Sequence, residues 1–197
     1  MGIVRPMNSA IDLGRPTSGD VIDLIIDDHR LFEQMLRQLR DTTQNLDAVR
    51  QAFADVLIAH GEAEEELVYP VLRRESDDVD EDDVEHGHEE HAEGNEALLE
   101  VLELKGTDTP AFAEAVEKLS NLIAHHIAEE EISILSPARE DVGPQVRAEL
   151  GEKWAARRNE LIDDSCGAVE NVRRVVAQAH REGLLDDEDD EADDSDD

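Results

Sequence analysis

Four segments of the chain carry apolar residues at alternating spacings of three and four, and histidine interrupts each of these stripes. This spacing places side chains on one face of an α-helix, so each stripe marks a face that a helix buries. The stripes are Ile22, Ile25, His29, Phe32, Leu36 and Leu39; Phe53, Leu57, His60, Glu64, Leu67 and Val71; Val84, His88, His91, Asn95, Leu98 and Leu102; and Phe112, Val116, Leu119, Ile123, His126, Glu130 and Ile134.

No alternating strand pattern occurs, and the chain is rich in Leu, Ile, Val and Ala. The predicted fold is all-α, an up-down-up-down four-helix bundle with an additional C-terminal helical region and a disordered acidic tail. We expect helices at 20–43, 47–74, 84–105, 110–136 and 143–182, the last one broken near Cys166. The expected organisation is an irregular arm at 1–17, the bundle at 18–140, a helical extension at 141–182 and the tail at 183–197.

Capping residues and prolines set these boundaries. Ser18 or Asp20 can cap the first helix, and Thr109 followed by Pro110 suits the start of the fourth. Pro70 is expected to kink or end the second helix. The fourth helix is expected to end in the same way near residue 137, which is also a proline.

The net charge of −34 limits the classes of partner. Even without the ten acids of segment 183–197 the chain would carry −24, and such a surface repels phosphates and anionic lipids. We therefore expect no binding to nucleic acid or to a membrane. A single cysteine excludes an intramolecular disulfide. The N-terminal residues lack an apolar signal segment, which predicts a cytoplasmic protein.

The interrupted stripes predict a metal site. A lone histidine on an apolar stripe is more often a satisfied core residue, but here at least four imidazoles and two carboxylates converge in one bundle. An unpaired buried carboxylate is strongly unfavourable, and an unbonded imidazole costs about 1–3 kcal/mol. Metal ions would give every one of these groups a partner.

One further histidine and several glutamates near the stripes are expected to be solvated. His125, Glu129 and Glu131 fall off the stripe and should face solvent or its margin. The same solvated position is expected for Glu62, Glu65, Glu66, Glu89, Glu90 and Glu93.

The two halves of the predicted bundle resemble each other. Segment 27–36, DDHRLFEQML, aligns with 89–98, EEHAEGNEAL, and segment 59–67, AHGEAEEEL, aligns with 125–132, HHIAEEEI. Each half supplies one histidine and then a histidine four residues before a glutamate. Such an array suits two metal ions bridged by two carboxylates. His88 has no counterpart, because Ile26 occupies the corresponding place.

These segments resemble the hemerythrin-like, or HHE, cation-binding domains over about residues 20–137. The resemblance rests on DDHRLFEQML, HGEAEEELVYPVL, EEHAEGNEALLEVL and HHIAEEEISILSP. It implies a four-helix bundle around a non-haem, oxo-bridged di-iron centre, with Mn or Zn as less favoured metals. The residues that match the family's ligands are His29, His60, Glu64, His91, His126 and Glu130.

One position departs from the oxygen-carrying members of the family, which have two histidines four apart on the third helix. Here the residue four before His91 is Gly87. His88 lies three before it and is a candidate fifth histidine, and some HHE domains have a single histidine at this place. The number of histidines decides how many coordination positions stay open for O2, peroxide or NO.

The resemblance implies a protein that binds or reacts with O2, hydrogen peroxide or NO, with peroxide detoxification in oxidative stress favoured. Catalase-like peroxide decomposition would make it an enzyme, whereas reversible O2 carriage would not. The alternatives are an iron or oxygen sensor and a metal-stabilised binding module whose acidic tail contacts a basic protein. Plain solubility is the simpler explanation of that tail.

Overall fold

The computed structural model describes residues 11–185, which form helices and contain no strand. The elements are α1 (Val21–Leu39), α2 (Leu46–Ala63), η1 (Glu64–Val68), α3 (Tyr69–Glu75), α4 (Glu81–Glu103), α5 (Pro110–Glu130), η2 (Glu131–Leu135), α6 (Ser136–Asp141), α7 (Pro144–Asp163) and α8 (Val169–Glu182). Elements η1 and η2 are single π-helical turns that join their neighbours into continuous helices. The all-α prediction is confirmed for this part of the chain.

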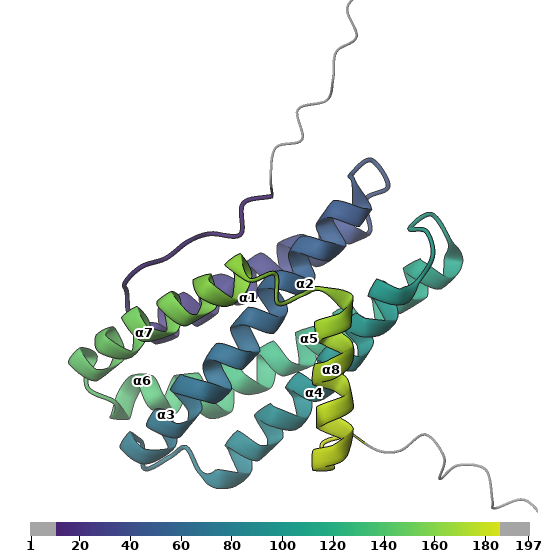
Figure 1. Cartoon of the computed structure of the whole chain (residues 1–197). Coiled ribbons are helices and arrows are strands. Elements are labelled where there is room, and N and C mark those ends of the chain that lie inside the picture. Colours follow the sequence, from purple (N-terminus) through teal and green to yellow (C-terminus); the bar gives the residue numbers. More distant parts are fainter. Residues whose placement is uncertain (1–10, 186–197) are drawn as a thin grey trace, which may run out of the picture.

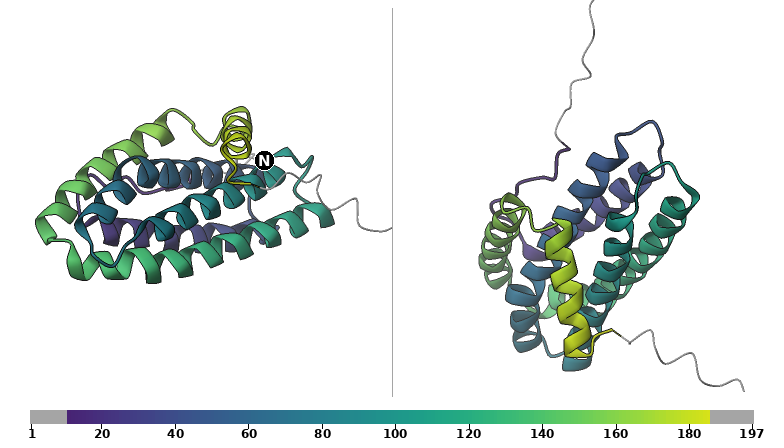
Figure 2. Two further views of the ribbon diagram at one scale, coloured as in Figure 1. Left: turned by 90° about the horizontal axis from the view of Figure 1, so that it is seen from below. Right: turned by 45° about the vertical axis from the view of Figure 1, so that its right-hand side comes forward.

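Four long helices surround the centre of the molecule. Helix α1 packs against α2 and α5, and α4 packs against the same two helices. They run alongside one another in Figure 1 and in the left view of Figure 2. Two apolar clusters fill the interior, one around Phe32, Phe53 and Phe112 and the other around Tyr69 and Trp154. Along α1, α2 and α5 the predicted histidines and glutamates lie between the two clusters.

The C-terminal extension forms part of the packed structure. Helix α7 packs along α1 and α2, and α8 packs across α4. In the left view of Figure 2, α8 is seen nearly end-on, whereas the long helices are seen lengthwise. Trp154 and Arg158 of α7 are fully buried. The break between α7 and α8 spans residues 164–168, as expected from Cys166 and Gly167.

The predicted caps at the helix starts are present. Asp20 caps α1 by accepting a hydrogen bond from the backbone N–H of Ile22, and Thr109 caps α5 ahead of Pro110. The predicted helix end near Pro137 is wrong, because the helix continues to Asp141. Proline has no backbone N–H to donate within a helix. A π turn precedes this proline and shifts the backbone hydrogen bonds by one residue, so the helix continues past it.

A π turn also precedes Pro70, and the second helix continues through this proline to Glu75. Pro70 therefore does not end the helix. The two π turns lie at corresponding places in the two repeats of the sequence. The first begins at Glu64, and the second begins directly after Glu130. Each π turn therefore lies at a predicted ligand.

The buried face of α4 is rotated by about one residue from the predicted stripe. Gly87, Gly94 and Val101 are buried, whereas the predicted His88 and Asn95 are only half-buried. The glycines allow close packing: a Cβ atom at residue 87 would lie 3.1 Å from the Tyr69 hydroxyl, and one at residue 94 would lie 3.2 Å from Ile123. A count of apolar residues misses this face because glycine has no apolar side chain.

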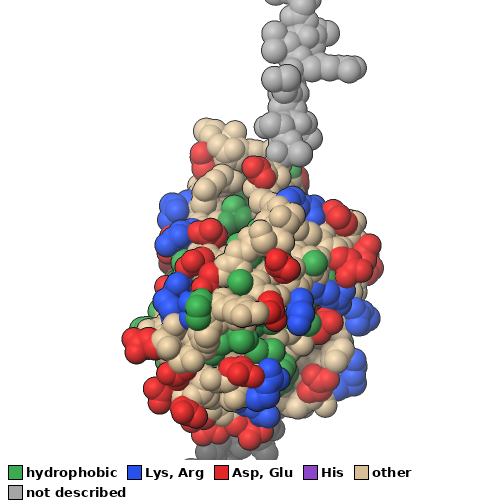
Figure 3. All heavy atoms as spheres, turned by 90° about the vertical axis from the view of Figure 1, so that its left-hand side faces the viewer, with side chains coloured by type: hydrophobic (Ala, Val, Ile, Leu, Met, Phe, Trp, Pro, Cys, Tyr) green, Lys and Arg blue, Asp and Glu red, His purple; other side chains and the backbone are tan. Residues whose placement is uncertain are grey.

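The surface carries charges of both signs. On the face in Figure 3, Asp and Glu side chains are spread among Arg and Lys side chains. Among the described residues, no helix is long and apolar enough to cross a membrane. Residues 1–10 of the expected arm, and residues 186–197 of the expected disordered tail, lie outside the described residues.

Candidate metal centre

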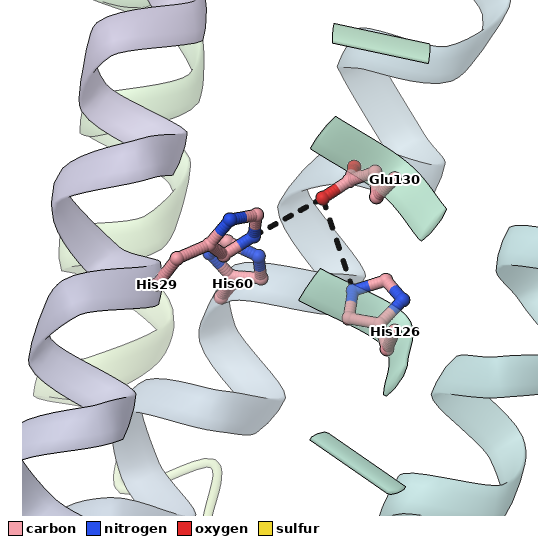
Figure 4. Close-up of side chains that lie close together, drawn as sticks. All are labelled: His29, His60, His126 and Glu130. Carbon is pink, nitrogen blue, oxygen red and sulfur yellow. Dashed lines mark ion pairs between the residues drawn. The ribbon is translucent and has the colours of Figure 1, made fainter. Parts of the chain in front are cut away.

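Four histidines from four different helices meet in the interior. His29 of α1, His60 of α2, His91 of α4 and His126 of α5 are all buried, with the most exposed, His91, at 8%. Figure 4 shows three of these imidazoles around the carboxylate of Glu130. The 3.6-residue period of each helix brings its histidine inward together with the neighbouring core residues.

Each of the two buried glutamates lies between two imidazoles. Glu130 Oε2 lies 3.1 Å from His29 Nε2 and 3.8 Å from His126 Nε2. Glu64 Oε2 lies 3.0 Å from His60 Nε2 and 3.5 Å from His91 Nε2. The two carboxylates thus occupy equivalent places, as the repeat in the sequence predicts.

These side chains form two overlapping sets that could hold metal ions. His29, His60, His126 and Glu130 form one set, and Glu64, His91 and His126 form the other, with ligand atoms in each set within 4.8 Å of one another. The structure therefore brings together all six residues that match the family's ligands. Nitrogen and oxygen donors in this arrangement suit a metal ion.

The inward-facing atoms lack hydrogen-bond partners. The Nε2 atoms of all four histidines, both carboxylate oxygens of Glu64 and Oε2 of Glu130 are buried and make no hydrogen bond. Leaving one buried polar group unsatisfied costs about 1–3 kcal/mol, so this concentration of them would strongly destabilise the core. Cations would satisfy these atoms together, which makes the donor set fit a metal centre.

Each histidine also faces an acidic side chain with its other nitrogen. The Nδ1 atoms of His29, His60, His91 and His126 lie 3.0, 3.3, 2.8 and 3.1 Å from carboxylate oxygens. The partners, in the same order, are Glu131, Asp28, Glu65 and Glu90. A carboxylate on Nδ1 fixes the orientation of the ring and leaves Nε2 free to bind a metal.

These outer carboxylates follow the internal repeat. Asp28 and Glu90 directly precede the single histidines, whereas Glu65 and Glu131 directly follow the buried glutamates. The expectation that Glu90 is solvated is wrong, because it is 7% exposed and bound to His126. Glu65 and Glu131 are half-buried at the margin of the site. The acidic neighbour at the same place in both repeats is the signal that could have identified them.

Electrostatics in this chamber favour proton binding when no metal is present. Burial lowers the pKa of His29, but the neighbouring carboxylates of Glu130 and Glu131 outweigh it and raise that pKa to about 10. His91 behaves in the same way through Glu64 and Glu65, again with a pKa of about 10. Metal ions would replace these protons, so binding releases protons to solvent.

Tyr69 is a further member of the site that the stripes did not indicate. Its buried hydroxyl donates a hydrogen bond to Glu130 Oε1 at 3.1 Å, and its ring stacks on His91. Burial raises its pKa, and Glu130 and Glu64 raise it further, well above the usual value, so the phenol keeps its proton. The phenol fills the space beside Gly87, where oxygen carriers of the resembled family have a second histidine.

His88 lies outside both ligand sets. Its side chain is 31% exposed, and its Nδ1 atom lies 3.4 Å from Glu65 Oε2. Its ring meets Tyr69 edge-on. The structure thus places the candidate fifth histidine beside an outer carboxylate and not among the inward-facing nitrogens.

Helix α7 completes the surroundings of the centre. Arg158 binds both oxygens of Asp28, with Nη2 at 2.8 Å from Oδ1, and Asp28 in turn contacts His60. Trp154 meets the His60 ring edge-on. We expected the extension to lie outside the bundle domain, and no pattern in the sequence linked Arg158 to the centre.

A small cavity adjoins the centre between α2, α4 and α5. Polar and small residues line it together with apolar ones: Leu57, His60, Gly61, Glu90, His91, Gly94, Asn95, Ile123 and His126. Phe32 and Leu119, also in the core, are fully buried. Three of the four histidines, His60, His91 and His126, border this cavity.

Comparisons with known proteins agree with this geometry. Residues 20–138 match the model of the hemerythrin HHE cation-binding domain. A protein named DNA nickase, from Nostoc sp. (strain PCC 7120), is 29% identical over 140 residues, which cover 69% of this chain and 37% of that protein. No solved structure matches the chain. Because the family model covers more than half of its length, the chain belongs to the hemerythrin HHE cation-binding domain family.

Proposed function

We propose that this protein is a non-haem di-iron protein that decomposes hydrogen peroxide at the buried centre and also binds O2 or NO. The observation that carries the proposal is the set of four imidazole Nε2 atoms that converge on two glutamates without hydrogen-bond partners. The long helices would form the up-down-up-down bundle expected for such a centre. Two iron ions would supply the redox chemistry.

In this proposal the ligands divide into terminal and bridging groups. His29, His60, His91 and His126 would each bind through Nε2, and their Nδ1 atoms would stay on the outer carboxylates. Glu64 and Glu130 lie between imidazole pairs and would bridge the two ions. Iron is preferred to Mn or Zn because of the family resemblance.

The surroundings favour a reactive centre over a sealed carrier. With His88 outside the ligand sets, fewer histidines fill the coordination positions than in the oxygen carriers. A small cavity adjoins His60, His91 and His126, and a ligand would approach the centre from this side. Tyr69 holds a proton on its hydroxyl and orients Glu130 through a hydrogen bond. Apolar walls keep bulk water from the remaining faces.

The acidic character of the chain argues against a nucleic-acid partner. The match to the DNA nickase spans 37% of that protein, and a net charge of −34 repels phosphates. We therefore propose that this chain acts on small molecules in the cytoplasm and does not bind DNA.

The test is metal content together with peroxide turnover. Protein purified from iron-supplemented cells should contain about two iron ions per chain, absorb in the near ultraviolet through oxo-to-iron bands, and evolve O2 from hydrogen peroxide. The same protein with His126→Ala should lose the metal and the activity. Colourless protein that holds zinc alone would overturn the redox proposal.

Two alternative functions have the same centre, and they predict different results in this test. Coloured protein that binds O2 or NO but leaves peroxide intact would indicate carriage or sensing. A binding module that uses its acidic tail would retain partner binding when the centre is emptied but lose it when residues 183–197 are removed.

A further inference from the structure

The structure assigns a second, outer metal site to His86, Glu90 and His125, at the surface next to the buried centre. His86 lies on α4 and His125 on α5, two helices that pack against each other. Their Nε2 atoms lie 3.7 and 3.6 Å from the same carboxylate oxygen, Oε1 of Glu90. All three ligand atoms lie within 4.8 Å of one another.

The oxygen between the two imidazoles is buried and lacks a hydrogen-bond partner. Glu90 is 7% exposed, and its Oε1 atom makes no hydrogen bond, whereas Oε2 lies 3.1 Å from His126 Nδ1. A buried carboxylate oxygen without a partner is costly, and a cation at the outer site would satisfy it. Exposed acidic clusters are common without metal, but this one combines two imidazoles with a buried acceptor.

The internal repeat gives an independent argument. Asp28 and Glu90 are equivalent, since each precedes the single histidine of its half and contacts the Nδ1 atom of the paired histidine. The guanidinium of Arg158 neutralises Asp28. Among the described residues, no arginine or lysine contacts Glu90, and His86 and His125 occupy its open side. A divalent cation held by these histidines would neutralise Glu90, as Arg158 neutralises Asp28.

The geometry suits a borderline transition-metal ion. Zn–N and Zn–O bonds of about 2.0–2.2 Å place ligand atoms of a tetrahedral site about 3.4 Å apart, so the observed distances need to shorten only slightly. The side chains of His86 and His125 are 55% and 60% exposed and can rotate. His86 Nδ1 lies 3.6 Å from Glu89 Oε2, so a carboxylate can orient this imidazole, as the outer carboxylates do at the buried centre. Water would complete the coordination.

Zinc binding to the iron-loaded protein tests the assignment. Wild-type protein and a His86→Ala/His125→Ala variant are dialysed against the same series of Zn²⁺ concentrations, and zinc and iron per chain are measured in each sample. We expect the wild type to hold one zinc ion more than the double variant, with equal iron. Each single variant should weaken the site by more than about tenfold.

A His180→Ala variant serves as the matched control, because it removes a histidine of α8 that contacts Glu96 instead. It should bind zinc like the wild type. Because the readout is the difference between variants, zinc exchange at the buried centre changes both proteins equally. Equal zinc in the wild type and the double variant would overturn the assignment, as would loss of the same ion in His180→Ala.

Discussion

Arg158 of α7 and Asp28 of α1 form a buried ion pair in which the guanidinium contacts both carboxylate oxygens. Asp28 Oδ2 also lies 3.3 Å from Nδ1 of His60, a predicted metal ligand. Asp28 therefore connects Arg158 to His60. The C-terminal extension is thereby connected to the centre, although Arg158 is 130 residues away from Asp28 in the sequence.

Replacing Arg158 with methionine should destabilise the protein and weaken its hold on metal. Asp28 would be left as a buried carboxylate without its cation, and breaking a buried pair costs about 3–5 kcal/mol. His60 would lose a well-oriented partner, which lowers metal affinity about 10–100-fold. Thermal unfolding and iron per chain measure the two effects.

Arg157→Met is the matched control for Arg158→Met. Arg157 pairs with Glu66 at the surface, where such pairs contribute at most about 1 kcal/mol. Equal losses in the two variants would show that Arg158 stabilises α7 in general and does not act through Asp28.

The adjacent histidines of α5 should behave differently when each is changed to alanine. His126 is buried with Nε2 facing the centre, so His126→Ala should remove iron from the centre and lower the melting temperature. His125 is exposed and outside the buried ligand sets, so His125→Ala should leave both unchanged in buffer without added zinc. Iron analysis and thermal melts compare them. Equal iron loss in the two variants would mean that the wrong face of α5 has been assigned to the centre.

His88→Ala should retain the iron content of the wild type. The side chain lies outside both ligand sets and contacts Glu65, so its removal disturbs a neighbour of His91 but no inward-facing nitrogen. Iron per chain, measured after dialysis against a weak chelator, is the readout. A loss of about half the iron would instead identify His88 as a fifth histidine ligand.

Tyr69→Phe should keep the fold and the iron but alter the centre. The ring would still stack on His91, whereas Glu130 Oε1 would lose its hydrogen bond from the phenol. An unsatisfied buried acceptor costs about 1–3 kcal/mol, which should appear as a lower melting temperature of the metal-free protein. The near-ultraviolet bands of the loaded protein should shift. Unchanged stability and spectra would show that this hydrogen bond has no role.

The metal-free protein should lose stability as the pH rises. His29 and His91 have a pKa of about 10 in the folded chamber against 6.5 for the ordinary group. Their protonated forms therefore stabilise the fold fully below pH 6.5, and this stabilisation is lost as the pH rises through about 10.

The measurement compares melting temperatures of chelated and iron-loaded protein between pH 6.5 and about 10. The chelated form should become less stable across this range. The loaded form should change less, because metal has already displaced those protons. Parallel curves for the two forms would contradict this account of the chamber.

The sequence alone predicted the helices, the buried stripes of α1 and α5, the stripe of α2 as far as Glu64, and the six residues that meet at the centre. It could do so because helical periodicity is local, and the alternating spacing of three and four identifies an inward face without knowledge of its neighbours. His60 and Glu64, four apart, share that face in any helix. Beyond Glu64 the π turn shifts the buried face by one residue, so Val68 and Leu72 are buried and the predicted Leu67 and Val71 are half-buried. The family resemblance rests on the same local pattern, and the match over residues 20–138 agrees with it.

The tertiary structure decided what surrounds those residues. Glycines at 87 and 94 turned a different face of α4 inward, because close packing against Tyr69 and Ile123 outweighed the apolar pattern. The roles of Glu90 and Arg158 depend on contacts between helices far apart in the chain, and no periodicity within one helix encodes such a contact. The ligands therefore follow from local spacing, whereas their supporting charges follow only from the packing of the helices.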